Sequence, residues 1–150
     1  MRRYGEAVIE GQRYEDRPGA YACIGDGAGN LLLAATTVRG EEFLLPGGGI
    51  DEGEAPLQAL HREVMEETGW RVGDVRRLGA FQRYVYMPEY DKWARKVCHI
   101  YLCRGITKLA EPTEPDHTPL WVPGDLAVEH LSITGDRAFV AGLVASGIAF

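Results

Sequence analysis

The sequence lacks the features of several large protein classes. It has three cysteines, Cys23, Cys98 and Cys103, and none of them belongs to a CxxC pair or to a Cys/His zinc spacing. An odd number of scattered cysteines argues against a disulfide framework and against a zinc site, and favours buried free thiols. Met1 to Glu6 contain no apolar run of the kind that opens a secretory signal, so we expect a cytoplasmic protein.

Positive charge is also scarce. The 150 residues include 16 Lys and Arg against 22 Asp and Glu, a net charge of -6. The pairs Arg2-Arg3 and Arg76-Arg77 are isolated, so no basic patch is available to hold a nucleic-acid duplex. Repeats and low-complexity tracts are absent as well. We therefore expect one globular domain over residues 1–150, with neither a nucleic-acid duplex nor a membrane as its partner.

Short strand-like segments alternate with turn residues along the chain. We expect strands over residues 7–10, 20–25, 31–36, 42–45, 75–86, 96–104 and 120–122, a hairpin loop over 26–30 and a Pro/Glu-rich loop over 110–119. A helix is predicted over 55–68, because Pro56 suits the first turn and Gly69 suits the position after the last. A second helix is predicted over 136–146. Strands interleaved with two helices favour a layered α/β or α+β fold over a barrel.

The helix predicted over residues 55–68 carries an unusual arrangement of acids. Its apolar side, which can face the core, holds Leu57, Leu60, Val64, Met65 and Thr68. Glu63, Glu66 and Glu67 gather on another side, within an arc of about 100°. The helix dipole disfavours acids in the last turn by about 0.3–1 kcal/mol each, and like charges four apart repel by ~0.2–0.5 kcal/mol. A solvated face is the plain interpretation, but these costs favour a bound divalent cation such as Mg²⁺.

The same acids form part of a longer motif. Gly48, then Glu54, then the run Arg62-Glu63-Val64-Met65-Glu66-Glu67-Thr68-Gly69-Trp70 resemble the Nudix box in residue type and spacing. Trp70 departs from the pattern, where the family usually has a bulky aliphatic residue, and we interpret it as a packing variant. The resemblance to Nudix (MutT-like) hydrolases implies an α/β fold, an α/β/α sandwich with a mixed β-sheet between helices.

The resemblance also implies an activity and its metal ligands. Glu63, Glu66 and Glu67 match positions that bind divalent metal, commonly completed by the backbone carbonyl of Gly47. The implied reaction is Mg²⁺-dependent hydrolysis, with Mn²⁺ as an alternative ion, of a diphosphate linkage between a nucleoside diphosphate and another group X. The alternative is a catalytically silent nucleotide-binding or sensor module. Such a module would be expected to lack box carboxylates, and here all three are present.

Several further residues receive roles. Arg62 matches an arginine that orients the carboxylates, and Glu54 matches an acid that is largely structural. Gly48 and Gly49 lack a Cβ atom, so their backbone can approach the metal and the phosphates closely. The general base is either a box glutamate or an acid of the later loop, where Glu114 and Asp116 are candidates against the alternative of a solvated loop. The histidines are expected to be structural or solvent-exposed, with His117, which adjoins Asp116 in the candidate loop, as the candidate for a role in the site.

The sequence says less about the substrate. Tyr84 and Tyr86 share strand parity, and with Tyr90 and Trp93 they form an aromatic-rich stretch that could stack a nucleobase, against the alternative of ordinary packing. Tyr86 and Pro88 both occupy a window linked to ADP-ribose or dinucleoside polyphosphates, and they do not decide between these. Nucleoside triphosphates and nucleotide sugars stay open. Leu44-Leu45-Pro46 replaces the tryptophan-containing approach of RNA-pyrophosphohydrolase-like members, which disfavours an RNA 5′ end. A homodimer is compatible with the sequence, which does not decide the oligomeric state.

Overall fold

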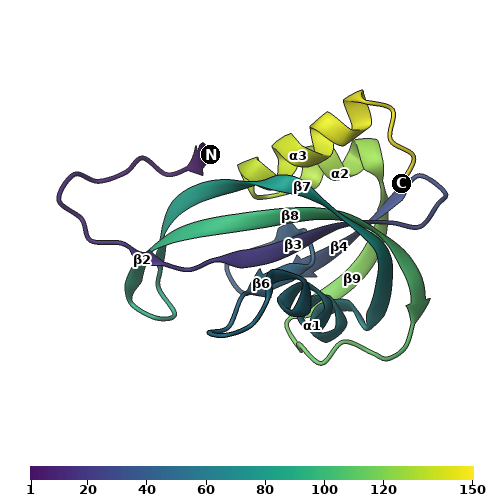
Figure 1. Ribbon diagram of the computed structural model, residues 1–150, viewed down its shortest axis with the longest axis horizontal. Helices are drawn as coiled ribbons and strands as arrows, with labels where there is room; N and C mark the ends of the chain where they lie inside the picture. Colours follow the sequence, from purple (N-terminus) through teal and green to yellow (C-terminus); the bar gives the residue numbers. More distant parts are fainter.

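The computed structural model describes all 150 residues as a mixed β-sheet with helices on both faces (Figure 1). The strands are β1 (Arg2–Gly5), β2 (Glu15–Asp16), β3 (Gly19–Gly25), β4 (Asn30–Thr36), β5 (Glu42–Leu44), β6 (Gly47–Gly49), β7 (Trp70–Met87), β8 (Lys92–Lys108) and β9 (His117–Pro123). The helices are α1 (Pro56–Thr68), α2 (Gly124–His130) and α3 (Thr134–Ala145). The main sheet runs in the order β1-β7-β8-β3-β4-β5, while β2, β6 and β9 pair with β8, β3 and β4.

Two long strands form the frame of the sheet. β7 and β8 have 18 and 17 residues and pair as an antiparallel hairpin that curves across the molecule. β3 runs parallel to β8 in unbroken register from Gly19 opposite Cys98 to Gly25 opposite Arg104. β6 adds to the other side of β3, at its start. Pairing with β3 therefore places the glycine-rich segment 47–49 next to helix α1.

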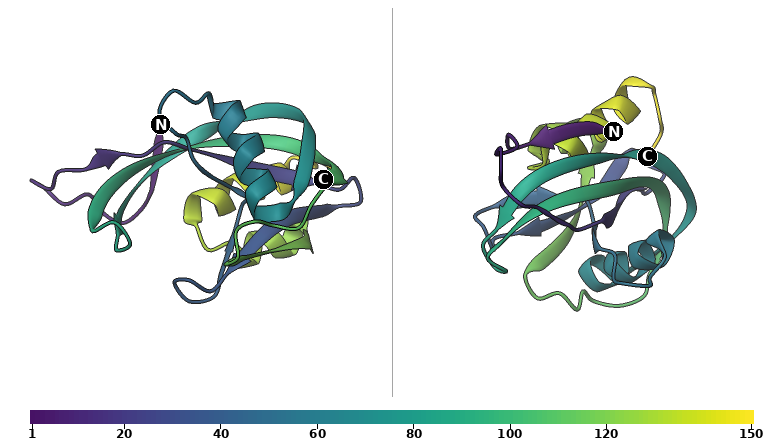
Figure 2. Two further views of the ribbon diagram at one scale, coloured as in Figure 1. Left: turned by 90° about the horizontal axis from the view of Figure 1, so that it is seen from below. Right: turned by 60° about the vertical axis from the view of Figure 1, so that its left-hand side comes forward.

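The helices divide between the two faces of the sheet (Figure 2). On one face, Ala59, Leu60 and Val64 of α1 pack against Ala20, Ala22, Ile24 and Leu32 of the sheet. On the other face, Ala127 and Leu131 of the α2 region and Val140 and Leu143 of α3 pack against Leu31, Leu33, Phe81 and Ile100. Burying each of the Leu, Ile, Val and Phe side chains among them contributes roughly 1.5–3 kcal/mol. The predicted α/β/α sandwich with a mixed sheet is confirmed.

Helix α1 begins and ends where the sequence predicts. Pro56 occupies its first turn, and Gly69 caps the end with φ 74°, its N–H donating to the Met65 carbonyl at 2.9 Å. A Cβ at Gly69 would lie 1.8 Å from the Ala110 carbonyl oxygen, so no other residue fits. One part of the predicted apolar side is wrong, because Leu57 is 46% exposed and lies in the first turn beyond the edge of the sheet contact.

Two further predictions about elements are corrected. The strand predicted over residues 7–10 is wrong, because the first strand is β1, which pairs in parallel with β7 from Arg2 opposite Phe81 to Gly5 opposite Tyr84. Val8 and Ile9 are instead exposed in an irregular segment. Helix α2 was not expected, because Pro123 and Gly124 have the composition of a turn and the helix has only 7 residues.

The three cysteines are buried free thiols, as predicted. Cys23 and Cys98 face the α2 and α3 side of the sheet, and Cys103 faces α1. Burial raises the pKa of Cys98 and of Cys103 to about 12, so these thiols are neutral and act as small apolar groups. No helix is long and apolar enough to cross a bilayer.

Candidate active site

The glycine-rich strand β6 lies directly against helix α1. Gly47 has φ 148°, and a Cβ there would come within 2.2 Å of the Ala20 carbonyl oxygen. A Cβ on Gly48 would fall 2.5 Å from the carboxylate of Glu63. Both positions therefore exclude a side chain, the first through the backbone of β3 and the second through the box carboxylate itself. This close approach places backbone amides and carbonyls beside the acids of α1.

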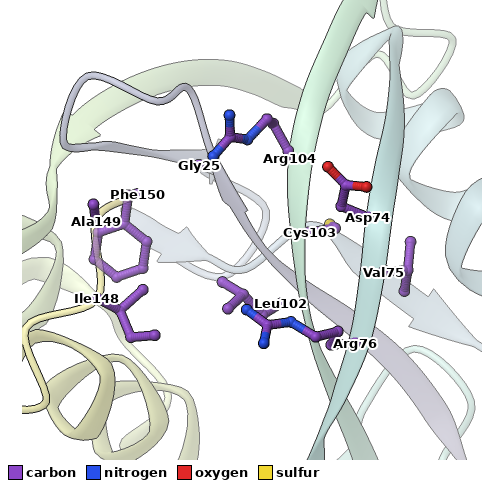
Figure 3. Close-up of a pocket in the computed structure, with 10 residues that line it drawn as sticks. All are labelled: Gly25, Asp74, Val75, Arg76, Leu102, Cys103, Arg104, Ile148, Ala149 and Phe150. Atoms are coloured by element: carbon purple, nitrogen blue, oxygen red, sulfur yellow. The ribbon is translucent and has the colours of Figure 1, made fainter.

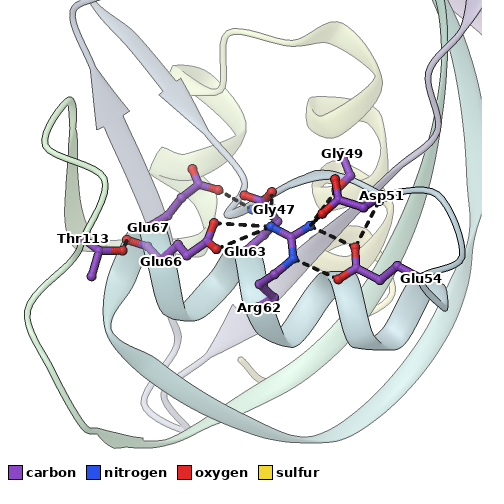
Figure 4. Close-up of polar contacts among 9 residues, drawn as sticks. All are labelled: Gly47, Gly49, Asp51, Glu54, Arg62, Glu63, Glu66, Glu67 and Thr113. Atoms are coloured by element: carbon purple, nitrogen blue, oxygen red, sulfur yellow. Dashed lines mark hydrogen bonds and ion pairs between the residues drawn. The ribbon is translucent and has the colours of Figure 1, made fainter.

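Arg62 ties the loop before α1 to the acids of the helix (Figure 4). Its Nε and Nη2 donate to the two oxygens of Glu54 at 2.8 and 2.9 Å, a bidentate contact. Nη2 also donates to the Gly49 carbonyl at 3.0 Å, and Nη1 donates to Glu63 at 2.9 Å and reaches Glu66 at 3.4 Å. One guanidinium thus fixes the loop and two carboxylates, which is the orienting role that the resemblance implies.

Glu67 is the deepest of the three box acids. It is only 4% exposed, and one of its oxygens accepts the Gly47 N–H at 2.8 Å. The other oxygen lies 3.2 Å from Nε2 of His117 at the start of β9. Strand β6 and strand β9 therefore hold this carboxylate from two sides, although Gly47 and His117 are far apart in the sequence.

The box acids sit in an environment that opposes their charge. Burial, together with the charges of Glu63, Glu114 and Glu66, raises the pKa of Glu67 to about 8, against the hydrogen bond from the Gly47 N–H, which lowers it. Burial also raises the pKa of Glu63, against the contact with Arg62, which lowers it. Glu54 behaves oppositely, because its hydrogen bonds from Arg62 lower its pKa to about 2. Arg62 therefore stabilises the charge of Glu54 most strongly. It makes no contact with Glu67.

The donor set suits a hard divalent ion. Three carboxylates on one side of α1 and the backbone carbonyls of the 47–49 segment are the oxygen ligands that Mg²⁺ and Mn²⁺ prefer, and the excess negative charge around Glu67 would be relieved by a cation. No three acidic, histidine or cysteine side chains already converge on one centre. Arg62 holds Glu63 and Glu66, and Gly47 N–H and His117 hold Glu67. The residues fit the ion in chemistry, and side-chain rotation is needed to gather them.

The loop that follows β8 docks on the end of α1. The N–H groups of Thr113 and Glu114 both donate to the Glu66 carbonyl, at 2.8 and 3.0 Å. Glu114 is half-buried and lies close enough to raise the pKa of Glu63 and of Glu67 through its charge. Asp116 is exposed and forms no ion pair. Of the two candidate loop acids, the structure brings Glu114 to the site and leaves Asp116 outside it.

Two hollows that share lining residues lie next to Gly49 and Asp51, which contact Arg62, and next to His117, which contacts Glu67; together we call them the active-site cleft. One part has a volume of about 660 Å³ and is lined by Tyr21, Gly49, Asp51, Glu52 and Tyr90, among others. A second part of about 260 Å³ is lined by Thr36, Leu44, Arg83, Val85 and His117, among others. Met87, Glu89 and Lys96 line both parts. The cleft therefore passes from the loop before α1 to the histidine that contacts Glu67.

Tyr84 and Tyr86 do not lie in this cleft. Arg83, Val85 and Met87 of β7 line it, and the alternating residues Tyr84 and Tyr86 point to the opposite face of the strand. There Tyr84 packs edge-on against Tyr14 at 4.8 Å between ring centroids, and Tyr86 packs against Trp93 at 5.1 Å. Because Tyr84 and Tyr86 have the same parity in β7, both side chains point away from the cleft. The aromatic rings that line the cleft are Tyr90, which the sequence placed in the same aromatic-rich stretch, and Tyr21, which the sequence did not single out.

Another cavity lies on a different part of the sheet (Figure 3). It has a volume of about 540 Å³ and is lined by residues of β3, β7 and β8 and by the chain end, including Arg76, Arg104, Leu102 and Phe150. None of the box residues reaches it. The predicted chemistry therefore belongs to the active-site cleft and not to this cavity.

Trp70, the departure from the box pattern, is accounted for by packing. Its ring meets Trp121 of β9 edge-on, at 5.3 Å between centroids and 88° between planes. Gly105 of β8 leaves room for both rings, because a Cβ there would lie 3.2 to 3.4 Å from them. An aromatic residue after Gly69 therefore fills the space under α1 without touching the acids.

Comparisons with known proteins agree with this geometry. A model of the NUDIX domain matches residues 15–143, so the chain belongs to the NUDIX family. It is 35% identical over 95 residues to an RNA pyrophosphohydrolase of Photobacterium profundum, which covers 61% of this chain and 53% of that protein. It is 37% identical over 89 residues to a CMP-5'-(N-acetyl-N-hydroxy-3-aminopropyl)phosphonate hydrolase of Streptomyces rubellomurinus, covering 58% and 40%. The matches thus span about half or less of these relatives' length.

Solved structures share the fold. A MutT protein from Bacillus halodurans superposes with a TM-score of 0.69 at 21% identity, covering 83% of this chain and 80% of that one. A NUDIX hydrolase from Nitrosomonas europaea gives a TM-score of 0.69 at 17% identity, covering 91% and 93%. At these identities the likeness establishes the architecture, and the chemistry has to be argued from the residues of the site.

Proposed function

We propose that this protein is a Mg²⁺-dependent pyrophosphohydrolase that cleaves a diphosphate linkage between a nucleoside diphosphate and another group X. The observation that carries the proposal is the set Arg62, Glu63, Glu66 and Glu67 under the side-chain-free strand β6. This set contacts the active-site cleft through Gly49 and His117, which line it. Family membership supports it, because the box that defines the family is the part of this chain that forms the cluster.

The chain's own residues divide the work. Glu63, Glu66 and Glu67 supply the oxygen ligands for the ion, and Arg62 controls where Glu63 and Glu66 point. A bound Mg²⁺ supplies neutralisation of phosphate charge and lowers the pKa of a water. The glycines at 47–49 leave room for phosphate oxygens to approach the backbone.

A carboxylate beside the cluster takes the proton from the attacking water. Glu67 and Glu114 are the candidates that the structure brings together, and Glu67 is hydrogen-bonded to the protein on both of its oxygens. Glu114 is half-buried beside it and has no ion pair, so its oxygens are free to accept. We therefore assign the base to Glu114 and keep Glu67 as a metal ligand.

The substrate is a small nucleotide derivative. The cleft is lined by two tyrosines and by basic side chains, which suits a nucleobase and anionic groups. Nucleoside triphosphates, ADP-ribose, nucleotide sugars and dinucleoside polyphosphates all meet this description. An RNA 5′-triphosphate end belongs in the same test, because one of the relatives is named for that activity.

The test is a hydrolysis screen over these substrates with Mg²⁺ or Mn²⁺, with products identified by mass. We expect turnover of at least one class that chelator abolishes, and a fall on the order of 100-fold in Glu67→Gln. Glu129→Gln, an exposed acid on α2, is the matched control and should retain full turnover. Tight nucleotide binding without any phosphate release would instead show a silent sensor module and would end the proposal.

A further inference from the structure

Two basic side chains face each other in the active-site cleft. Arg83 of β7 and Lys96 of β8 are direct partners in the antiparallel register, so their side chains leave the same face of the hairpin. Both line the part of the cleft that also contains His117. Like charges directly opposite one another on neighbouring strands destabilise a sheet. An arrangement of this kind calls for an explanation.

Neither cation has a protein partner. Lys92 pairs with Glu15 and Arg95 pairs with Asp16, but neither Arg83 nor Lys96 forms an ion pair or a side-chain hydrogen bond. Both side chains are nevertheless half-buried. Burial lowers the pKa of Lys96, and the charge of Arg83 lowers it further.

The acids near the pair do not neutralise it. Asp136 of α3 is buried on the same side of the sheet and forms no ion pair with either base; burial raises its pKa to about 7 although the charges of Arg83 and Lys96 lower it, so Asp136 offsets the pair only in part. Glu89 also lines the cleft, but it forms an ion pair with Arg39. Glu42 also lines the cleft and makes no ion pair with either base. In the part of the cleft that Arg83 and Lys96 both line, the bases Arg39, Arg83 and Lys96 therefore outnumber the acids Glu42 and Glu89.

The position of the pair relates it to the diphosphate. Lys96 lines both parts of the cleft, between the loop of Gly49 and Asp51 and the histidine that contacts Glu67. A substrate whose diphosphate lies on the acids of α1 would extend into this cleft with the rest of its structure. The acids and the basic pair are thus suited to different parts of one molecule.

We propose that Arg83 and Lys96 form a subsite for a second anionic group of the substrate, a phosphate or carboxylate carried outside the diphosphate that is cut. The proposal rests on the proposed function and narrows its substrate class. The group is held by charge-assisted hydrogen bonds from both side chains, and its charge relieves their mutual repulsion. Substrates of otherwise similar structure that lack such a group bind more weakly.

The first experiment measures anion binding without any hydrolysis. Inorganic phosphate is titrated calorimetrically into the full chain in the presence of chelator. We expect Arg83→Gln and Lys96→Gln each to weaken binding on the order of 10-fold to 100-fold. Arg77→Gln on β7 and Lys108→Gln at the end of β8 remove the same charge outside the cleft and should leave binding unchanged. No binding by the unaltered protein, or equal binding by all variants, overturns the subsite.

The second experiment compares matched substrates with Mg²⁺. ADP-ribose 2′-phosphate against ADP-ribose tests an extra phosphate on the nucleoside side, and UDP-glucuronate against UDP-glucose tests a carboxylate on the X side. We expect a lower KM for the charged member of at least one pair, and loss of that preference in Arg83→Gln with little change in kcat. Equal KM values within both pairs contradict the proposal. Phosphate binding that depends on the pair, with no hydrolysis of any substrate, leaves the subsite standing and removes the proposed function.

Discussion

Replacing Arg62 tests how much its contacts with the loop before α1 and with the acids of α1 stabilise the protein. Its guanidinium makes a bidentate contact with Glu54 and single contacts with the Gly49 carbonyl and Glu63. Removing one partner of a fully buried ion pair costs about 3–5 kcal/mol. Because the Arg62 side chain is 31% exposed, water can replace part of what is lost, and we expect Arg62→Ala to lower the free energy of unfolding by about 2 kcal/mol.

Arg62→Lys and a double-mutant cycle make this prediction specific. Lysine keeps the charge but cannot form the planar bidentate contact, so Arg62→Lys should lose about 1 kcal/mol. In urea unfolding without metal, the cycle of Arg62→Ala with Glu54→Gln should give a coupling energy of ~1–2 kcal/mol. Arg71→Ala, an exposed arginine at the start of β7, serves as the control. A loss below ~0.5 kcal/mol for Arg62→Ala, with no coupling, would refute the reasoning.

Three further predictions concern Gly48, His117 and Asp136. Gly48→Ala should push the Glu63 carboxylate aside, since the Cβ falls 2.5 Å from it, lowering turnover by on the order of 10-fold to 100-fold while unfolding in urea changes by less than ~1 kcal/mol. His117→Ala should weaken Mg²⁺ retention by Glu67, seen as a smaller rise of melting temperature with added ion. Asp136→Asn should flatten the fall in the free energy of unfolding between about pH 4 and about pH 7.

The pH dependence of Asp136 follows from its burial. Its pKa is raised from 3.8 to about 7, so the native state keeps a proton that the unfolded chain releases above about pH 4. The unfolded state then binds fewer protons, and the free energy of unfolding falls as pH rises from about 4 to about 7, by at most roughly 4 kcal/mol. Asp125→Asn, at an exposed position, should keep the slope. An identical slope in Asp136→Asn would contradict the assignment.

The predictions for Gly48→Ala and His117→Ala each have a result that would contradict them. Unchanged turnover in Gly48→Ala would mean that the Glu63 position seen here is not the one used in catalysis. An equal metal-dependent rise of melting temperature in His117→Ala and the unaltered protein would mean that the contact with Glu67 is incidental. Both variants should first be shown to unfold cooperatively, so that stability and function are read separately.

The sequence predicted the elements with strong local signals. Pro56 and Gly69 bound α1 as expected, because the proline ring and the left-handed glycine act within their own turn. Strand β1 escaped prediction because its pairing with β7 depends on a partner about 80 residues away, and its own residues are mostly polar and exposed. Helix α2 escaped because a 7-residue helix has too few turns to show a period.

In the site, too, features set within one element could be predicted, and features set by contacts between distant elements could not. The clustering of Glu63, Glu66 and Glu67 could be predicted because all three belong to one helix with fixed geometry. The contact of His117 with Glu67 depends on how β9 meets α1, and only the position of His117 next to Asp116 could be read from the sequence. Parity showed that Tyr84 and Tyr86 share a face but not which face is the cleft.

The most direct test of the account is a calorimetric titration of Mn²⁺ into the protein and into Glu67→Gln, at a pH above the value of about 8 to which burial raises the pKa of Glu67. The account predicts saturable binding to the protein and binding weakened on the order of 10-fold or more in Glu67→Gln, with Glu129→Gln unchanged. No saturable binding to the unaltered protein, or equal binding to Glu67→Gln, would contradict the claim that the acids of α1 hold a divalent ion.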